Sequence, residues 1–140
     1  MTSAMDQKAA RTAATKAFKT GGMPLRKGHH RLGDPKSDDI VWYVDLRAQG
    51  AGPSAPLRFE IGCWVAALGH PEPEGGPVDC PLLLDRSLAA TTPTELADEV
   101  GELVDLVSRL DSVSALGAAL TSGELGRPLV DHSLRTFLEE

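Results

Sequence analysis

Two segments in the first half of the chain alternate apolar and polar residues, and this pattern restricts the fold more than any other feature. In residues 57–65 one side carries Leu57, Phe59, Ile61, Cys63 and Val65, and the other carries Arg58, Glu60, Gly62 and Trp64. In residues 40–47 one side carries Ile40, Trp42, Val44 and Leu46, and the other carries Val41, Tyr43, Asp45 and Arg47. A period of two is that of a β-strand with one buried face. Consecutive strands with a connection like 48–56 usually pair antiparallel, so we expect an antiparallel sheet with one apolar face.

Weaker strand signals flank this pair. Residues 25–32 predict a polar strand, and Leu82-Leu83-Leu84 predicts a short fourth strand. Between them, residues 66–81 contain four prolines and predict a long loop. A loop of this length in a small domain is either functional or variable.

Helical patterns lie at the two ends of the chain. Residues 5–19 place Ala10, Ala13, Ala14, Ala17 and Phe18 on one stripe. Ser3 and Asp6 resemble a capping box before this helix, and Gly21-Gly22 ends it. A second helix is expected over residues 93–110, because Thr92 and Glu95 form a capping box around Pro93. We expect Asp111 to cap a third helix and Pro128 to begin a final one.

These elements predict a single α+β domain over residues 1–140. An N-terminal helix packs on an antiparallel sheet of three to four strands, followed by two to three C-terminal helices. The length of 140 residues and the hydrophobic fraction of 41% suit one domain.

The sequence lacks the common signatures of catalysis and cofactor binding. Its histidines and cysteines never fall at a metal-ligand spacing, and it contains no G-x-S-x-G, P-loop or G-x-G-x-x-G motif. We therefore expect no metal, no cofactor and no enzymatic activity. An alternative is a metal-dependent hydrolase or nuclease using Asp45 and Glu60 on the polar strand faces. The lysine that usually accompanies such acids is missing after Glu60, so ion pairs with Arg47 and Arg58 are the simpler interpretation.

Charge is distributed unevenly along the chain. Residues 1–36 hold eight basic and two acidic residues, whereas the whole chain carries a net charge of −6. Weak nucleic-acid binding is therefore a further alternative, through Lys8, Arg11, Lys16, Lys19, Arg26, Lys27 and Arg31. The acidic remainder repels phosphate and argues against a nucleic-acid partner.

The polar side of the two strong strands is the predicted binding surface. It brings together Tyr43, Arg47, Arg58 and Trp64, residue types that are enriched at protein–protein hot spots. Because exposing Trp64 to water is costly, we expect the C-terminal helices, or else a partner, to cover it.

Three short motifs between about residues 10 and 65 resemble a bacterial family of unknown function, domain of unknown function family 4304. They are Phe18 with Gly21-Gly22 and the basic segment 25–31, the strand segment 42–49 with its Trp and Gln, and Phe59-Glu60-Ile61-Gly62. The resemblance implies an α+β fold and no established activity.

The interpretation that combines these observations is a non-enzymatic protein-binding module with an immunity or defence role. Asn is absent and Arg outnumbers Lys, which is typical of a GC-rich bacterial source. We expect a cytoplasmic protein without a membrane association, because no apolar signal core follows Lys8 and Arg11 and no segment approaches about 20 apolar residues.

Overall fold

The computed structural model describes residues 6–50, 52 and 56–139. In chain order its elements are α1 (Gln7–Thr20), β1 (Leu25–Arg26), β2 (His29–Leu32), β3 (Ile40–Ala48), β4 (Leu57–Val65), η1 (Ala66–Leu68), η2 (Gly76–Asp79), β5 (Leu82–Ser87), α2 (Pro93–Arg109), α3 (Val113–Ser122), β6 (Leu129–Val130) and α4 (His132–Glu139). The expected α+β architecture, with an N-terminal helix on an antiparallel sheet and helices at the C-terminal end, is confirmed.

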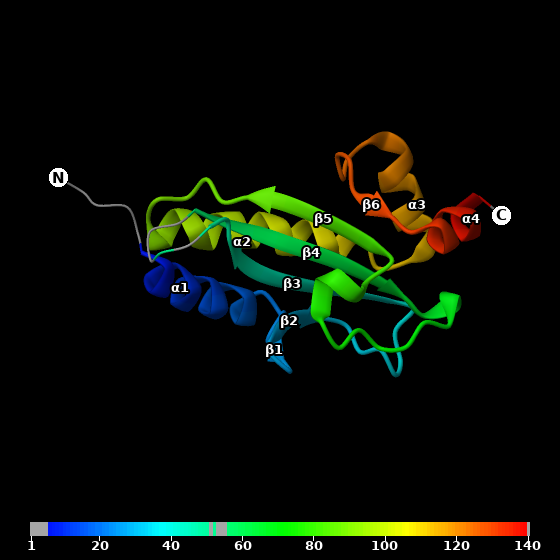
Figure 1. The fold of residues 1–140 in the computed structure, drawn as a ribbon, viewed down its shortest axis with the longest axis horizontal. Helices are drawn as coiled ribbons and strands as arrows, with labels where there is room; N and C mark the ends of the chain where they lie inside the picture. Colours follow the sequence, from blue (N-terminus) through cyan, green and yellow to red (C-terminus); the bar gives the residue numbers. More distant parts are fainter. Residues whose placement is uncertain (1–5, 51, 53–55, 140) are drawn as a thin grey trace.

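The sheet is an antiparallel meander of six strands in the order β1-β2-β3-β4-β5-β6 (Figure 1). Its centre is the predicted pair of strands, whose register runs from Ile40 opposite Val65 to Ala48 opposite Leu57. The sheet is wider than the three to four strands expected. Residues 25–32 form a hairpin instead of one strand, because Lys27 and Gly28 both have positive φ (53° and 86°) and turn the chain.

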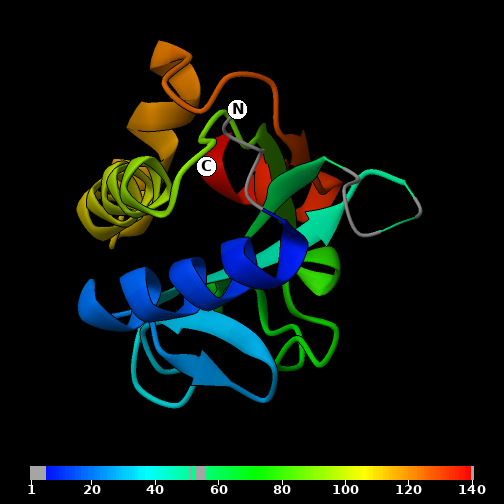
Figure 2. The ribbon, with the colours of Figure 1, turned by 90° about the vertical axis from the view of Figure 1, so that its left-hand side faces the viewer.

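The principal core lies between the sheet and the two long helices, α1 and α2 (Figure 2). All the strand residues predicted to face inward are buried there, including Ile40, Val44 and Phe59. Phe18 of α1 is fully buried and meets Phe59 edge to face, with ring centroids 6.0 Å apart. Trp42 Nε1 donates a hydrogen bond of 2.8 Å to the carbonyl of Leu110 at the end of α2. The predicted facing of the strands is therefore confirmed.

The opposite face of the sheet is covered by the segment between β4 and β5. Val41, Tyr43 and Trp64 form a second small buried cluster there. Trp64 Nε1 donates to the carbonyl of Pro71, 3.2 Å away. The expectation that the C-terminal helices cover Trp64 is wrong, because the proline-rich segment 66–81 does so.

Close contact between this segment and the sheet depends on Gly62. A Cβ atom at Gly62 would lie 2.6 Å from Pro77 Cα and 2.9 Å from Cys80 Sγ. Only a residue without a side chain allows the backbone of η2 to approach the strand so closely.

The N-terminal ends of the helices can be compared with the predicted capping residues. Thr92 Oγ1 accepts a hydrogen bond of 3.2 Å from the amide of Glu95, and α2 begins at Pro93 as predicted. Helix α1 begins after Asp6, whose carboxylate accepts from the amide of Ala9, while Ser3 lies outside the described residues. Ser112, rather than Asp111, caps α3.

The prediction that a helix begins at Pro128 is wrong. Leu129 and Val130 instead pair with Leu83 and Leu82 at the edge of β5. The amide of Asp131 then donates to the carbonyl of Pro81, and α4 begins only at His132. Pairing with the open edge of β5 satisfies backbone groups that a helix would have to satisfy internally.

Candidate functional site

Six charged or titratable side chains line the face of the sheet opposite the long helices. They are His29, Asp45, Arg47, Glu60, Arg58 and Asp85, and together they are called the charged cluster here. They come from four adjacent strands, β2 to β5, and ion pairs link neighbouring members.

The centre of the cluster is a pair of opposed carboxylates. Asp45 and Glu60 are direct partners in the β3–β4 register, and they are only 8% and 5% exposed. Like charges directly opposite each other destabilise a sheet, and a buried charge requires a partner. The guanidinium of Arg47 supplies it, with Nη2 3.3 Å from Asp45 Oδ2 and Nε 3.4 Å from Glu60 Oε1.

The other members extend this arrangement outward. His29 Nδ1 lies 2.7 Å from Asp45 Oδ1. On the far side, Arg58 lies 3.7 Å from Glu60 and 3.5 Å from Asp85. The predicted ion pairing of Asp45 and Glu60 with Arg47 and Arg58 is therefore present in the structure.

Both arginines remain partly open to solvent. The side chains of Arg47 and Arg58 are 47% and 32% exposed, although each forms an ion pair with the buried carboxylate of Glu60. Arg47 uses Nε and Nη2 toward the cluster, and its Nη1 makes no hydrogen bond to a described residue. A donor of Arg47 is therefore available to a ligand.

The structure separates the four residues of the predicted binding surface into two groups. Tyr43 and Trp64 are buried, 3% and 6% exposed, beneath the segment 66–81. Burial raises the pKa of Tyr43 to about 12, and the nearby carboxylate of Glu72 acts in the same direction. Arg47 and Arg58 are the two members that a partner can reach in this structure.

A pocket of about 300 Å³ opens at the edge of the charged cluster. Its walls come from α1, from the β1–β2 hairpin and from β3, and its polar groups belong to Arg11, Thr15, His29, Asp45 and Arg47. Arg11 is oriented by a hydrogen bond of 2.7 Å from Nη1 to the carbonyl of Leu46. Sequence reasoning did not place Arg11 and His29 beside Arg47, because three separate elements bring them together.

Two of the elements that form the walls of this pocket, α1 and the β1–β2 hairpin, carry further basic residues. Lys8, Lys16, Lys19, Arg26 and Lys27 are exposed, and none of them forms an ion pair with a described residue. Lys8, Arg11 and Lys19 fall at spacings that place them on one stripe of α1. The basic charge of the N-terminal segment is thus displayed beside the pocket.

Other chemistries find little support in the site. Within residues 6–50, 52 and 56–139, no group of three or more His, Cys, Asp or Glu side chains is placed to hold a metal ion. Burial raises the pKa of the Cys63 and Cys80 thiols, so neither side chain is set up as a thiolate nucleophile.

None of the helices in the described part of the chain is both long and apolar enough to span a bilayer. Comparisons with protein-family models, with curated proteins and with solved structures give no match to this chain.

Proposed function

We propose that the chain is a non-enzymatic protein-binding module that docks acidic side chains of a partner protein on Arg11, Arg47 and Arg58. The observation that carries this proposal is the pair of partly exposed guanidinium groups held against buried carboxylates. The role in bacterial immunity or defence, and kinship with family 4304, belong to the same proposal.

Anchoring an arginine in advance favours binding. A free arginine loses rotamer freedom when it binds a carboxylate, and that loss weakens the complex. Arg47 is already held by Asp45 and Glu60, and Arg11 is held by the carbonyl of Leu46. Their remaining N–H groups can form charge-assisted hydrogen bonds to a partner with less ordering.

The surrounding charge selects the kind of partner. Five exposed cations lie on α1 and the β1–β2 hairpin, the elements that form two walls of the pocket, without ion pairs to described residues. Their field attracts an acidic surface and accelerates encounter at low ionic strength. The buried Tyr43 and Trp64 act indirectly in this proposal, by holding the segment 66–81 against the sheet beside the cluster.

The same cations favour a second candidate, weak nucleic-acid binding through the basic N-terminal segment. A phosphate backbone would be attracted by the same field. A hydrolase using Asp45 and Glu60 has less support, because guanidinium groups already occupy both carboxylates. No cofactor is part of the proposal.

The test compares two anions with the same number of repeating units. A fluorescent ten-residue polyglutamate peptide and a ten-nucleotide oligothymidylate are titrated with the protein, and fluorescence anisotropy is recorded at several salt concentrations. The proposal expects the peptide to bind more tightly than the oligonucleotide. Tighter binding of the oligonucleotide would replace it with the nucleic-acid alternative.

Variants locate the binding site. Arg47→Lys keeps a positive charge over the buried carboxylates but removes the planar fork, and we expect at least a fivefold loss of peptide affinity. Arg11→Gln should give a similar loss, whereas Arg86→Gln, at an exposed position of β5 outside the pocket, is the matched control. Equal effects of Arg11→Gln and Arg86→Gln would contradict the assignment of the pocket.

A further inference from the structure

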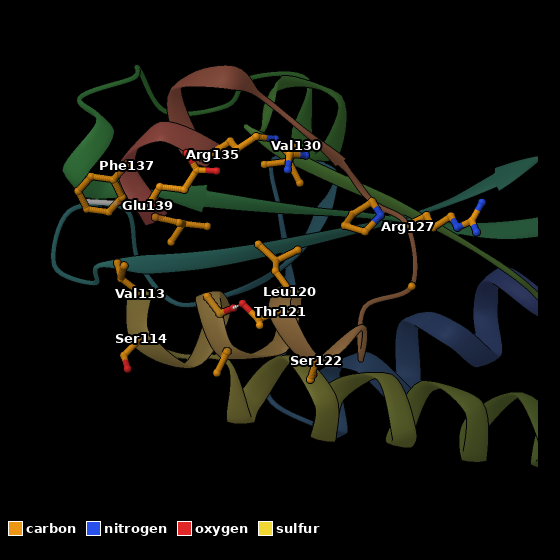
Figure 3. Close-up of a pocket in the computed structure, with 15 residues that line it drawn as sticks. Val113, Ser114, Leu120, Thr121, Ser122, Arg127, Val130, Arg135, Phe137 and Glu139 are labelled. Carbon is orange, nitrogen blue, oxygen red and sulfur yellow. Dashed lines mark hydrogen bonds between the residues drawn. The ribbon is translucent and has the colours of Figure 1, made fainter.

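A second, larger cavity shares no lining residue with the charged cluster. It is an open groove of about 1060 Å³ between α3 on one side and the segment 126–139, with β6 and α4, on the other (Figure 3). Strand β6 is one edge of the sheet, and β1, beside the pocket of Arg11, is the other. The groove is therefore a separate surface with its own chemistry.

Apolar side chains from both walls form its floor. Val113 and Leu120 come from α3, and Val130, Phe137 and Leu138 come from the opposite wall. All five are partly buried against the principal core, and each keeps part of its surface open. In Figure 3, Leu120 projects from α3 toward the side of the groove on which Val130 lies.

A glycine keeps the groove open at the middle of α3. Gly117 lines the groove, and a Cβ atom added there would meet only Leu138 Cδ2, 3.8 Å away. Glycine inside a helix lowers helix stability relative to alanine. Because no side chain occupies the space beside Gly117, a ligand can lie there, and a larger side chain at this position would fill that space.

Positive charge accompanies the apolar floor. Arg127 and Arg135 both line the groove, both are exposed, and neither forms an ion pair with a described residue. Glu139, one helical turn after Arg135, is the single carboxylate among the described residues of the lining. Two cations against one anion give this lining a net positive charge.

We propose that this groove binds a small amphipathic anion, of the class of medium-chain carboxylic acids. The alkyl chain would lie on the apolar floor beside Gly117, and the carboxylate would pair with Arg135 or Arg127. The volume is that of a site for a small organic ligand, and such sites combine apolar walls with a few polar groups that fix orientation. The charge of the two arginines selects an anion over a cation of the same shape.

The first test uses the unaltered protein and ligands that differ in one property. Decanoate and decyltrimethylammonium carry the same alkyl chain with opposite charge, and both are titrated below the concentration at which they form micelles. Isothermal titration calorimetry should show saturable binding of decanoate and at least tenfold weaker binding of the cation. Along hexanoate, octanoate and decanoate, affinity should rise about threefold to fourfold for each added CH₂ group. Equal binding of the two head groups, or no dependence on chain length, would overturn the proposal.

The second test places the ligand in the groove. Gly117→Leu fills the space beside Leu138 and should weaken decanoate binding at least tenfold. Gly101→Leu is its control, because Gly101 lies on α2 and a Cβ atom added there would meet no atom within 4 Å. Arg135→Gln should weaken binding, and Glu139→Gln should strengthen it by removing the opposing carboxylate. Equal losses in Gly117→Leu and Gly101→Leu, or no response to either charge change, would show that decanoate binds elsewhere.

Discussion

The contact between Gly62 and the segment 66–81 leads to the sharpest stability prediction. Gly62 has a backbone conformation outside the left-handed region, so alanine can adopt it without backbone strain. Its new methyl group, however, would lie 2.6 Å from Pro77 Cα and 2.7 Å from Pro77 O. Both are backbone atoms, which cannot move aside as the end of a flexible side chain can. Gly62→Ala should therefore push η2 away from the sheet.

Two opposing effects set the magnitude. Replacing glycine with alanine stabilises by about 0.4–1 kcal/mol where the conformation suits, because the unfolded chain loses freedom. Overpacking a tight site costs about 1–3 kcal/mol. We expect a net loss of up to about 2.6 kcal/mol in the free energy of unfolding, the difference between these two effects. If the segment instead leaves the sheet, the loss rises toward the roughly 1.5–3 kcal/mol that each uncovered large side chain, such as Trp64, contributes.

Urea unfolding followed by circular dichroism measures this change in the free energy of unfolding. Acrylamide quenching of tryptophan fluorescence reports whether the segment 66–81 still covers Trp64. Trp42, on the other face, is 1% exposed under the long helices and should stay protected. Gly101→Ala is the matched control, since it meets no neighbour and should stabilise α2 by about 1 kcal/mol. Unchanged stability and unchanged quenching in Gly62→Ala would refute the proposed packing of η2 on the sheet.

Three further substitutions test the core, a helix cap and a buried histidine. Phe59→Ala should lower the free energy of unfolding by about 3–5 kcal/mol, because Phe59 is 1% exposed in the core; a loss below about 1 kcal/mol would place it at the surface. Thr92→Ala should cost about 0.5–2 kcal/mol in urea unfolding through loss of the Glu95 cap, and Thr92→Ser should restore most of it. Burial lowers the pKa of His30 below its ordinary value of 6.5. As the pH falls below about 6.5, His30 therefore binds a proton in the unfolded chain before it does so in the folded chain, and the free energy of unfolding decreases. His30→Gln should make unfolding less sensitive to acid in that range, whereas His132→Gln, at an exposed position, should not.

The central strands, their facing and the long helices could be predicted from the sequence. Alternation in residues 40–47 and 57–65 and the capping box at Thr92 are local patterns, and the structure places all of them as expected. Such patterns determine which face of an element is apolar, because side-chain direction follows the backbone period. The ion pairing of Asp45 and Glu60 with the two arginines could also be predicted, because it depends only on the register of neighbouring strands.

Only the tertiary structure decided what covers the polar face and where the cavities lie. The segment 66–81, and not the C-terminal helices, covers Trp64, because Gly62 leaves room for the backbone of Pro77. Residues 129–130 form strand β6 instead of a helix because the edge of β5 offers them hydrogen-bond partners. The pocket at Arg11 and the groove at Gly117 each require elements that are distant in the chain. The periodicity of apolar residues describes one helix or strand at a time. A site between elements depends on how those elements pack against one another, and no local sequence pattern predicts that packing.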